Sequence, residues 1–121
     1  MKPEVKEAWV KALRSGEYQQ TTGRLRKYQG FSCLGVLCDI YNKQEQPLSV
    51  EERNWCYHMD ICCYTYDGFN STIPSCVQEW AGLDSNNPGY FDEHRGWREL
   101  ADINDQGKDF DYIADLIEVH F

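Results

Sequence analysis

The sequence lacks any long hydrophobic run. Among its 121 residues, no segment approaches the roughly 18 consecutive apolar residues of a membrane-spanning helix. Residues 1–4 lead directly into an amphipathic pattern, without the apolar region of a secretory signal. We therefore expect a protein that does not cross a membrane, is not secreted and stays in a cytoplasm.

A metal-binding cysteine pattern is also missing. None of the six cysteines forms a Cys-x-x-Cys pair, the spacing typical of structural zinc sites. Because we expect no secretion, disulfide bonds are not expected either, and we predict reduced, mostly buried thiols. We accordingly predict no metal site and no cofactor. The cysteines lie at positions 33, 38, 56, 62, 63 and 76.

Positive charge is scarce in the second half of the chain. Residues 1–60 contain nine Lys and Arg against eight Asp and Glu, whereas residues 61–121 contain three against twelve. General nucleic-acid binding needs a broad basic surface, which this distribution does not supply. A short basic patch for one small anion remains open, as does an acidic surface that imitates nucleic acid.

One nearly continuous apolar segment is present at residues 30–41, directly after the basic residues 24–27. On a helix its apolar side chains point in almost every direction, which predicts a buried central helix. Ser32 suits the N-cap position of this helix. Gly35, one turn later, would let another backbone approach closely, at a cost in helix propensity.

Shorter helices and strands are predicted on both sides of this segment. Ser75 with Gln78 fits a capping box, and Gly82 fits the end of a helix. Apolar stripes predict helices at residues 3–15, 75–82 and 97–107 and from Asp109 onward. Alternating patterns predict a strand or strand pair at residues 18–29 and a hairpin with strands near 54–59 and 61–66.

These elements together predict an α+β fold. We expect one compact domain over residues 1–121, in which a small antiparallel sheet packs against the buried central helix and several short helices.

The basic segment is the first candidate site. In an extended strand Arg24 and Arg26 point the same way, and Leu25 points into the core. The free amides at the start of the central helix would also favour an anion. Aromatic rings on the neighbouring predicted strand would stack on a nucleotide base. The predicted ligand-binding residues are Arg24, Arg26, Lys27, Trp55 and Tyr57; the alternative is an ordinary solvated strand face with core aromatics.

The second candidate is Cys33. The segment Phe31-Ser32-Cys33-Leu34-Gly35-Val36-Leu37 resembles the cysteine-bearing turn of papain-like NlpC/P60 hydrolases, in which a helix N-terminus activates the nucleophile. That family has Asp where this chain has Ser32. His58 is a candidate base, but no third, orienting residue stands out. The alternative is a small buried thiol, and we assign no catalytic residue.

The third candidate is the C-terminal helix pair. Residues 100–115 resemble the helix-turn-helix of small DNA-binding proteins. A recognition helix that displays acidic side chains would repel phosphates, so we predict no direct DNA binding and a helical hairpin packed on the sheet. The acidic face could instead act as a decoy for a nucleic-acid-binding protein. It consists of Asp111, Asp115 and Glu118.

Four motifs in order carry a resemblance over nearly the whole chain. They are Met1-Lys2-Pro3-Glu4-Val5-Lys6, Cys33-Leu34-Gly35-Val36-Leu37-Cys38-Asp39, Val77-Gln78-Glu79-Trp80-Ala81-Gly82-Leu83, and Asn104-Asp105-x-Gly107 before Phe110 and Ile113-Ala114-Asp115. In these the chain resembles a family of small proteins of tailed phages and prophages. The resemblance brings no site residues, but it implies the cytoplasm of an infected bacterium.

Our leading hypothesis is a non-enzymatic phage anti-defence protein that sequesters a small nucleotide-type immune signal. One alternative is a Cys33-dependent thiol hydrolase or transferase, and another is the acidic decoy. Because binding pockets are often built at subunit boundaries, a homo-oligomer also remains open.

Overall fold

The computed structural model describes residues 1–45, 48–54 and 62–121. The helices within these residues are α1 (Pro3–Arg14), α2 (Cys33–Gln44), α3 (Ser75–Ala81), α4 (Leu100–Asp105) and α5 (Phe110–His120). The strands are β1 (Gln19–Gln20), β2 (Arg26–Lys27), β3 (Gly30–Phe31), β4 (Val50–Asn54), β5 (Cys62–Tyr66), β6 (Gly89–Asp92) and β7 (Gly96–Glu99).

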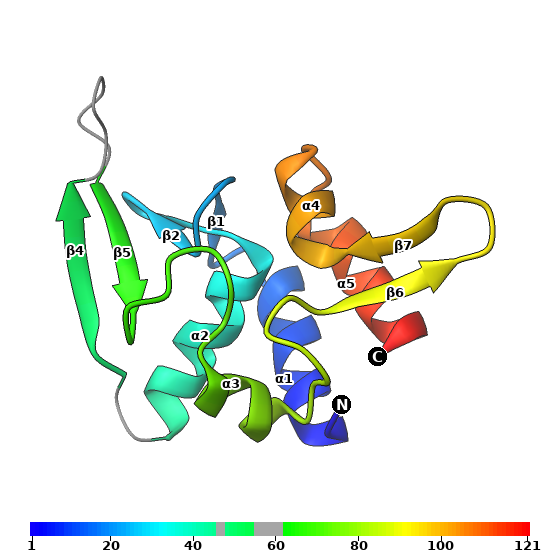
Figure 1. Cartoon of the computed structure of the whole chain (residues 1–121), viewed down its shortest axis with the longest axis horizontal. Helices are drawn as coiled ribbons and strands as arrows, with labels where there is room; N and C mark the ends of the chain where they lie inside the picture. Colours follow the sequence, from blue (N-terminus) through cyan, green and yellow to red (C-terminus); the bar gives the residue numbers. More distant parts are fainter. Residues whose placement is uncertain (46–47, 55–61) are drawn as a thin grey trace.

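The strands form two separate sheets. The larger has the order β1-β3-β2-β5-β4 and is antiparallel except for the β1–β3 pair. Strands β6 and β7 form an antiparallel ribbon of their own at the other end of the molecule (Figure 1). The predicted α+β class, with a small sheet beside a central helix, is confirmed.

Helix α2 is the buried centre of the fold, as predicted. Ser32 is its N-cap, and the Ser32 hydroxyl accepts a hydrogen bond of 3.1 Å from the Gly35 amide. A Cβ atom at Gly35 would lie only 1.8 Å from the carbonyl oxygen of Leu25, so the two backbones touch here. Leu25 itself is fully buried, as the sequence predicted.

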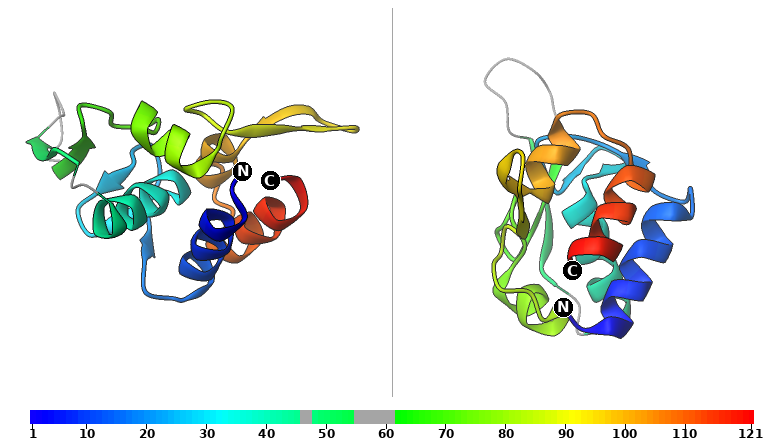
Figure 2. Two further views of the ribbon diagram at one scale, coloured as in Figure 1. Left: turned by 90° about the horizontal axis from the view of Figure 1, so that it is seen from below. Right: turned by 90° about the vertical axis from the view of Figure 1, so that its right-hand side faces the viewer.

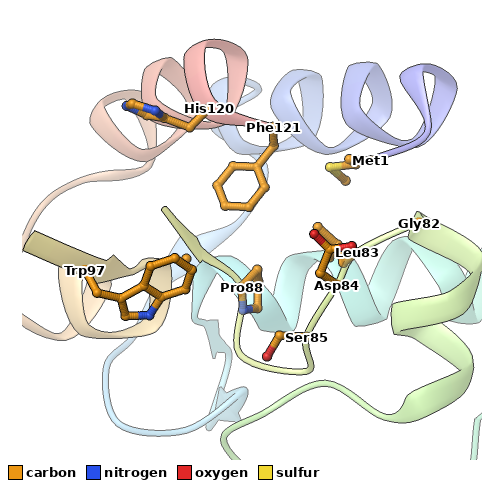
Figure 3. A pocket seen from close by; sticks show the side chains of 10 residues that line it. Met1, Gly82, Leu83, Asp84, Ser85, Pro88, Trp97, His120 and Phe121 are labelled. Atoms are coloured by element: carbon orange, nitrogen blue, oxygen red, sulfur yellow. The ribbon is translucent and has the colours of Figure 1, made fainter. Parts of the chain in front are cut away.

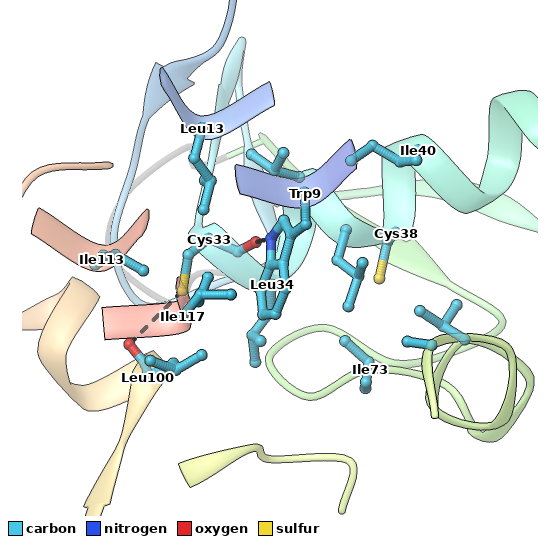
Figure 4. Close-up of a cluster of buried hydrophobic side chains, with 14 of the residues drawn as sticks. Trp9, Leu13, Cys33, Leu34, Cys38, Ile40, Ile73, Leu100, Ile113 and Ile117 are labelled. Carbon is cyan, nitrogen blue, oxygen red and sulfur yellow. Dashed lines mark hydrogen bonds between the residues drawn. The ribbon is translucent and has the colours of Figure 1, made fainter. Parts of the chain in front are cut away.

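Helices α1 and α5 pack side by side and cover one flank of α2 (Figure 2). The indole of Trp9 on α1 is fully buried and donates a hydrogen bond of 2.9 Å to the Cys33 carbonyl (Figure 4). Asp109 caps α5, since its side chain accepts from the Tyr112 amide. The apolar stripe predicted for this helix faces the core, with Phe110, Ile113, Ala114 and Ile117 buried.

The C-terminal half differs from the prediction in three places. Trp97 lies in β7 and not in a helix, because residues 89–99 form the β6–β7 hairpin and α4 begins only at Leu100. Ser75 is not an N-cap, since α3 starts with it and Pro74 precedes it without a side-chain cap. Helices α4 and α5 pack on α2 and α1, where the sequence had suggested packing on the sheet.

The N-terminal half differs in the extent of its strands. Residues 18–29 contribute two strands of two residues each, β1 and β2, and Arg24 lies before β2. The first strand of the predicted hairpin runs from Val50 to Asn54, earlier than expected, and residues 55–61 lie outside the described part of the chain. The second strand, β5, is where the pattern placed it.

Candidate functional site

Arg26 is held between two aromatic rings. Its Cζ atom lies 3.9 Å from the centre of the Tyr64 ring and 5.0 Å from that of Phe31. Both contacts follow from strand register, because Arg26 is paired with Tyr64 of β5 on one side and Phe31 of β3 on the other. Guanidinium groups are attracted to ring faces, so this arrangement fixes the side chain. Its Nε atom is buried and has no hydrogen-bond partner among the described residues.

A buried phenol lies close to this guanidinium. Tyr66 follows Tyr64 by two residues in β5 and therefore points to the same side of the sheet. Its side chain is 1% exposed, and its hydroxyl has no hydrogen-bond partner within the described chain. Burial raises the pKa of Tyr66, an effect that the charge of Arg26 partly opposes. The phenol is therefore neutral at physiological pH.

Asp39 on α2 is engaged by two other side chains. The Tyr18 hydroxyl donates to its Oδ2 atom at 2.5 Å, and Lys43 Nζ lies 2.9 Å from the same atom. Burial and, secondly, the hydrogen bond to Asp39 raise the pKa of Tyr18 to about 12.

The three predicted cations are neighbours in the sequence, but their side chains have different surroundings. Arg24 and Lys27 are half-buried, and Arg24 Nη1 donates to the Gly23 carbonyl at 2.8 Å. Because Arg24 precedes β2, strand alternation does not place it beside Arg26. Within the described residues none of the three forms an ion pair with a carboxylate, whereas Arg14 and Lys43 do. Trp55 and Tyr57, the predicted stacking residues, lie outside the described residues.

The anion site predicted at the start of α2 is absent. Ser32 is 6% exposed and Cys33 is fully buried, so solvent does not reach this end of the helix. The Cys33 amide donates to Oδ1 of Asn104 at 3.2 Å, and the Gly35 amide is bonded to Ser32. These amides already have partners, which leaves no place for a phosphate.

Asn104 is a residue whose role the sequence did not reveal. Its side chain is fully buried and connects three segments. Besides the Cys33 amide it accepts a bond of 2.9 Å from Gln20 Nε2, and it donates one of 2.8 Å to the Thr21 carbonyl. The next residue, Asp105, accepts from the Gly23 amide at 2.8 Å. The Asn104-Asp105 motif thus ties the loop before β2 to the start of α2.

The surroundings of Cys33 do not favour a nucleophile. Its side chain is fully buried, and its Sγ atom lies 3.7 Å from the Leu100 carbonyl (Figure 4). Burial raises the pKa of the Cys33 thiol to about 12, so the helix N-terminus does not produce a thiolate at neutral pH. His58, the candidate base, lies outside the described residues. Cys33 serves as a small core residue.

Thiol labelling checks this reading of Cys33. At pH 7.5 we expect iodoacetamide to modify Cys76, which is partly exposed, while Cys33 and Cys38 react at least about a hundredfold more slowly than in the urea-unfolded chain. The reason is that ionisation and access both require the core to open. Peptide mass spectrometry over time measures each rate. Native labelling of Cys33 faster than of Cys76 would contradict the assignment.

The acidic face of α5 is partly neutralised by α1. Arg14 pairs with Asp115 at 2.5 Å and with Glu118 at 2.8 Å, and these contacts raise the pKa of Arg14. Lys6 donates to the Glu118 carbonyl at 3.0 Å. Asp111 is exposed. A decoy for a basic groove would need an unpaired run of acids, which Asp115 and Glu118 do not provide.

A small pocket lies where the β6–β7 ribbon meets the two ends of the chain (Figure 3). It has a volume of about 180 Å³, and Trp97, Phe121 and Met1 are among the residues that line it.

Over the described residues we find no cluster of three or more His, Cys, Asp or Glu side chains able to hold a metal ion. None of the helices formed by the described residues is both long and apolar enough to span a bilayer.

Comparison with known proteins gives a family but no relative of known activity. No curated protein and no solved structure matches the chain. A family model described as "Domain of unknown function (DUF8296)" matches residues 1–121, its full length. The chain therefore belongs to the DUF8296 family.

Proposed function

We propose that this protein binds a small phosphorylated, nucleotide-like ligand at the segment from Arg24 to Lys27, without catalysing a reaction. The observation that carries the proposal is the setting of Arg26. Its guanidinium is fixed by two rings, and its Nε atom has no hydrogen-bond partner among the described residues. A fixed guanidinium loses little freedom when it binds a phosphate, so it is preorganised for that ligand.

The neighbouring cations support an anionic ligand. Arg24 and Lys27 lie within two residues of Arg26, and no described carboxylate pairs with either. In a chain of net charge −8, such a group of three cations is a local exception. Arg24 and Lys27 thus add positive charge around the segment, while Arg26 supplies the direct contact to the phosphate.

The base of the ligand would stack on aromatic side chains. Trp55 and Tyr57 remain the proposed residues for this contact, since they follow β4 directly in the chain. Base stacking contributes roughly 1–3 kcal/mol per ring and tolerates any base. The resemblance to phage and prophage families suggests the biological role. By holding a cyclic-nucleotide or ADP-ribose-type signal, the protein would lower its free concentration in an infected bacterium.

Isothermal titration calorimetry tests the proposal. We expect binding to at least one of cyclic AMP, a cyclic dinucleotide and ADP-ribose, and an affinity loss of about tenfold or more in Arg26→Ala, which is about 1.4 kcal/mol. Arg24→Ala and Lys27→Ala should each weaken binding less, because neither removes the stacked guanidinium. Inorganic phosphate alone should bind more weakly than the intact nucleotide.

The matched control is Lys11→Ala, which removes an exposed cation from α1. It should leave the affinity unchanged. Since Arg26 also packs between rings, Arg26→Ala is first checked by circular dichroism, and Arg24→Ala and Lys27→Ala decide the question if it unfolds. The proposal would be wrong if no nucleotide gave binding heat. It would also be wrong if Arg24→Ala, Arg26→Ala and Lys27→Ala all bound with the affinity of the unmodified chain.

A further inference from the structure

The β6–β7 hairpin projects from the body of the molecule (Figures 1 and 2) and carries two exposed aromatic side chains. Phe91 is 68% exposed and Trp97 is 60% exposed. The two residues are directly paired in the ribbon, so their side chains lie on the same side of it. Large exposed aromatic residues that adjoin each other are typical of interaction surfaces.

The hairpin is held rigidly in this position. On its other side, the Tyr90 ring stacks on His120 of α5, with ring centres 3.9 Å apart. At the tip, Oδ1 of Asp92 accepts the amides of His94 and Arg95 at 2.8 and 3.0 Å. The aromatic pair is therefore presented at a fixed place, which lowers the entropy lost on binding.

Trp97 itself is also oriented. Its indole lies across Gly89, where a Cβ atom would come within 2.9 Å of two ring atoms. A side chain at position 89 would displace the ring. The exposed ring is thus part of the hairpin's packed structure.

The outer edge of β7 has no neighbouring strand among the described residues. The Leu100 amide donates to the Pro88 carbonyl at 3.0 Å, which identifies Pro88–Leu100 as a hydrogen-bonded pair of the ribbon. Bonded and non-bonded pairs alternate in an antiparallel ribbon, so Phe91–Trp97 is a non-bonded pair. The N–H and C=O groups of Trp97 consequently point outward from the ribbon, where a further strand could pair with them.

We propose that β7 pairs with β7 of a second copy of this chain, antiparallel and about a two-fold axis at Trp97. The Trp97 backbones of the two copies then exchange two hydrogen bonds, and their indoles meet on one face of a four-stranded sheet. In this register Arg95, the turn residue that directly precedes β7, lies beside the end of β7 of the other copy, where Glu99 stands. An ion pair between Arg95 of one copy and Glu99 of the other therefore flanks the aromatic contact on each side.

The charges favour this edge over the other edge of the hairpin. A two-fold axis at Phe91, which would join the β6 edges, places Gly89 opposite Glu93 and brings no opposite charges together. The carboxylate of Glu99 is also held in place, because it accepts a hydrogen bond from the Asn87 side chain. The charges of Glu99 and of the preceding turn residue Arg95, together with an outward-pointing backbone, thus favour the β7 edge.

The surface involved is small. With about 200 Å² per aromatic side chain, the exposed parts of Phe91 and Trp97 amount to roughly 250 Å² in each copy. Stable dimers bury roughly 1,200 Å² or more in total. We therefore expect a weak dimer, which forms at micromolar concentrations or above.

Sedimentation velocity over about 1–300 μM at 150 mM salt tests this interface. The unmodified chain should shift from monomer to dimer as its concentration rises. Arg95→Glu and Glu99→Arg should each remain monomeric, because like charges then face each other at both flanks. An equimolar mixture of the two variants should form a heterodimer, since opposite charges meet again at both flanks. This rescue is specific to the proposed register.

Trp97→Ala should weaken dimerisation at least tenfold. Two matched controls should dimerise normally. Val119→Ala shortens another exposed apolar side chain, and Glu79→Arg changes the net charge by the same amount as Glu99→Arg. A monomer at every concentration, an unaffected Trp97→Ala, or no heterodimer from two folded charge variants would each overturn the proposal. If Glu99→Arg unfolds, the monomer–dimer equilibria of Trp97→Ala and Arg95→Glu decide whether the proposed interface exists. The result is independent of the proposed ligand.

Discussion

Gly35→Ala should destabilise the fold by about 3 kcal/mol or more, the largest effect we expect from adding one methyl group. The new Cβ atom would lie 1.8 Å from the oxygen and 2.7 Å from the carbon of the Leu25 carbonyl. Both contacts are with backbone atoms, so no side-chain rotation relieves them.

The backbone at Leu25 has little freedom to move away. Its amide donates to the Asn70 carbonyl at 2.6 Å, and its carbonyl accepts from the Ser32 amide at 2.9 Å. The Leu25 side chain is fully buried. A shift large enough to accept the methyl group would break at least one of these contacts. The free energy of unfolding therefore falls, although alanine is a better helix former than glycine.

Urea denaturation, followed by circular dichroism and tryptophan fluorescence, measures this change. Gly23→Ala is the matched control: its φ is +82° and nothing lies within 4 Å of the added Cβ atom, so it should cost only about 1 kcal/mol. A Gly35→Ala variant as stable as the unmodified chain, or no less stable than Gly23→Ala, would refute the close approach of the two backbones.

Asn104→Ala should cost about 2–4 kcal/mol. It removes the acceptor of the Cys33 amide and the donor to the Thr21 carbonyl, and leaves Gln20 without one of its partners. Buried polar groups that lose their partners pay the full cost of desolvation. The higher helix propensity of alanine in α4 offsets only about 0.5 kcal/mol of this.

The same denaturation experiment checks this prediction, with Asn86→Ala as the control because Asn86 is exposed. The control should change the free energy of unfolding by less than about 0.5 kcal/mol. Asn104→Asp adds a sharper comparison, since a carboxylate still accepts from Cys33 but cannot donate to Thr21. If Asn104→Ala proved as stable as the control, the side chain would not connect these segments.

The helices were predictable because each carries a local signal. The stripe of α5 and its cap at Asp109, and the cap of α2 at Ser32, are patterns within a few residues of sequence. The β6–β7 hairpin was missed because Trp97, Leu100 and Ala101 have helical spacing, although the hairpin ends between them. Local spacing does not distinguish a strand residue next to a helix from the first turn of that helix.

The candidate site was predictable in its composition but not in its setting. Three of the four residues from Arg24 to Lys27 are cations, which the sequence alone shows. That Arg26 lies between Phe31 and Tyr64 depends on a strand register between segments nearly 40 residues apart, which no local pattern encodes. The same holds for Cys33: its sequence context fits either an activated or a buried thiol, and only the packing of α1 and α4 around it selects burial.

The pairing of α1 with α5 has a consequence for how the protein is made. Arg14 and Glu118, which join these helices, are separated by 104 positions in the sequence. On a translating ribosome, α1 emerges long before the helix that covers it, so Trp9 and Leu13 stay without their full set of neighbours until α5 has been made. Such a chain completes its core only after α5 leaves the exit tunnel, and until then the apolar side of its first helix stays uncovered.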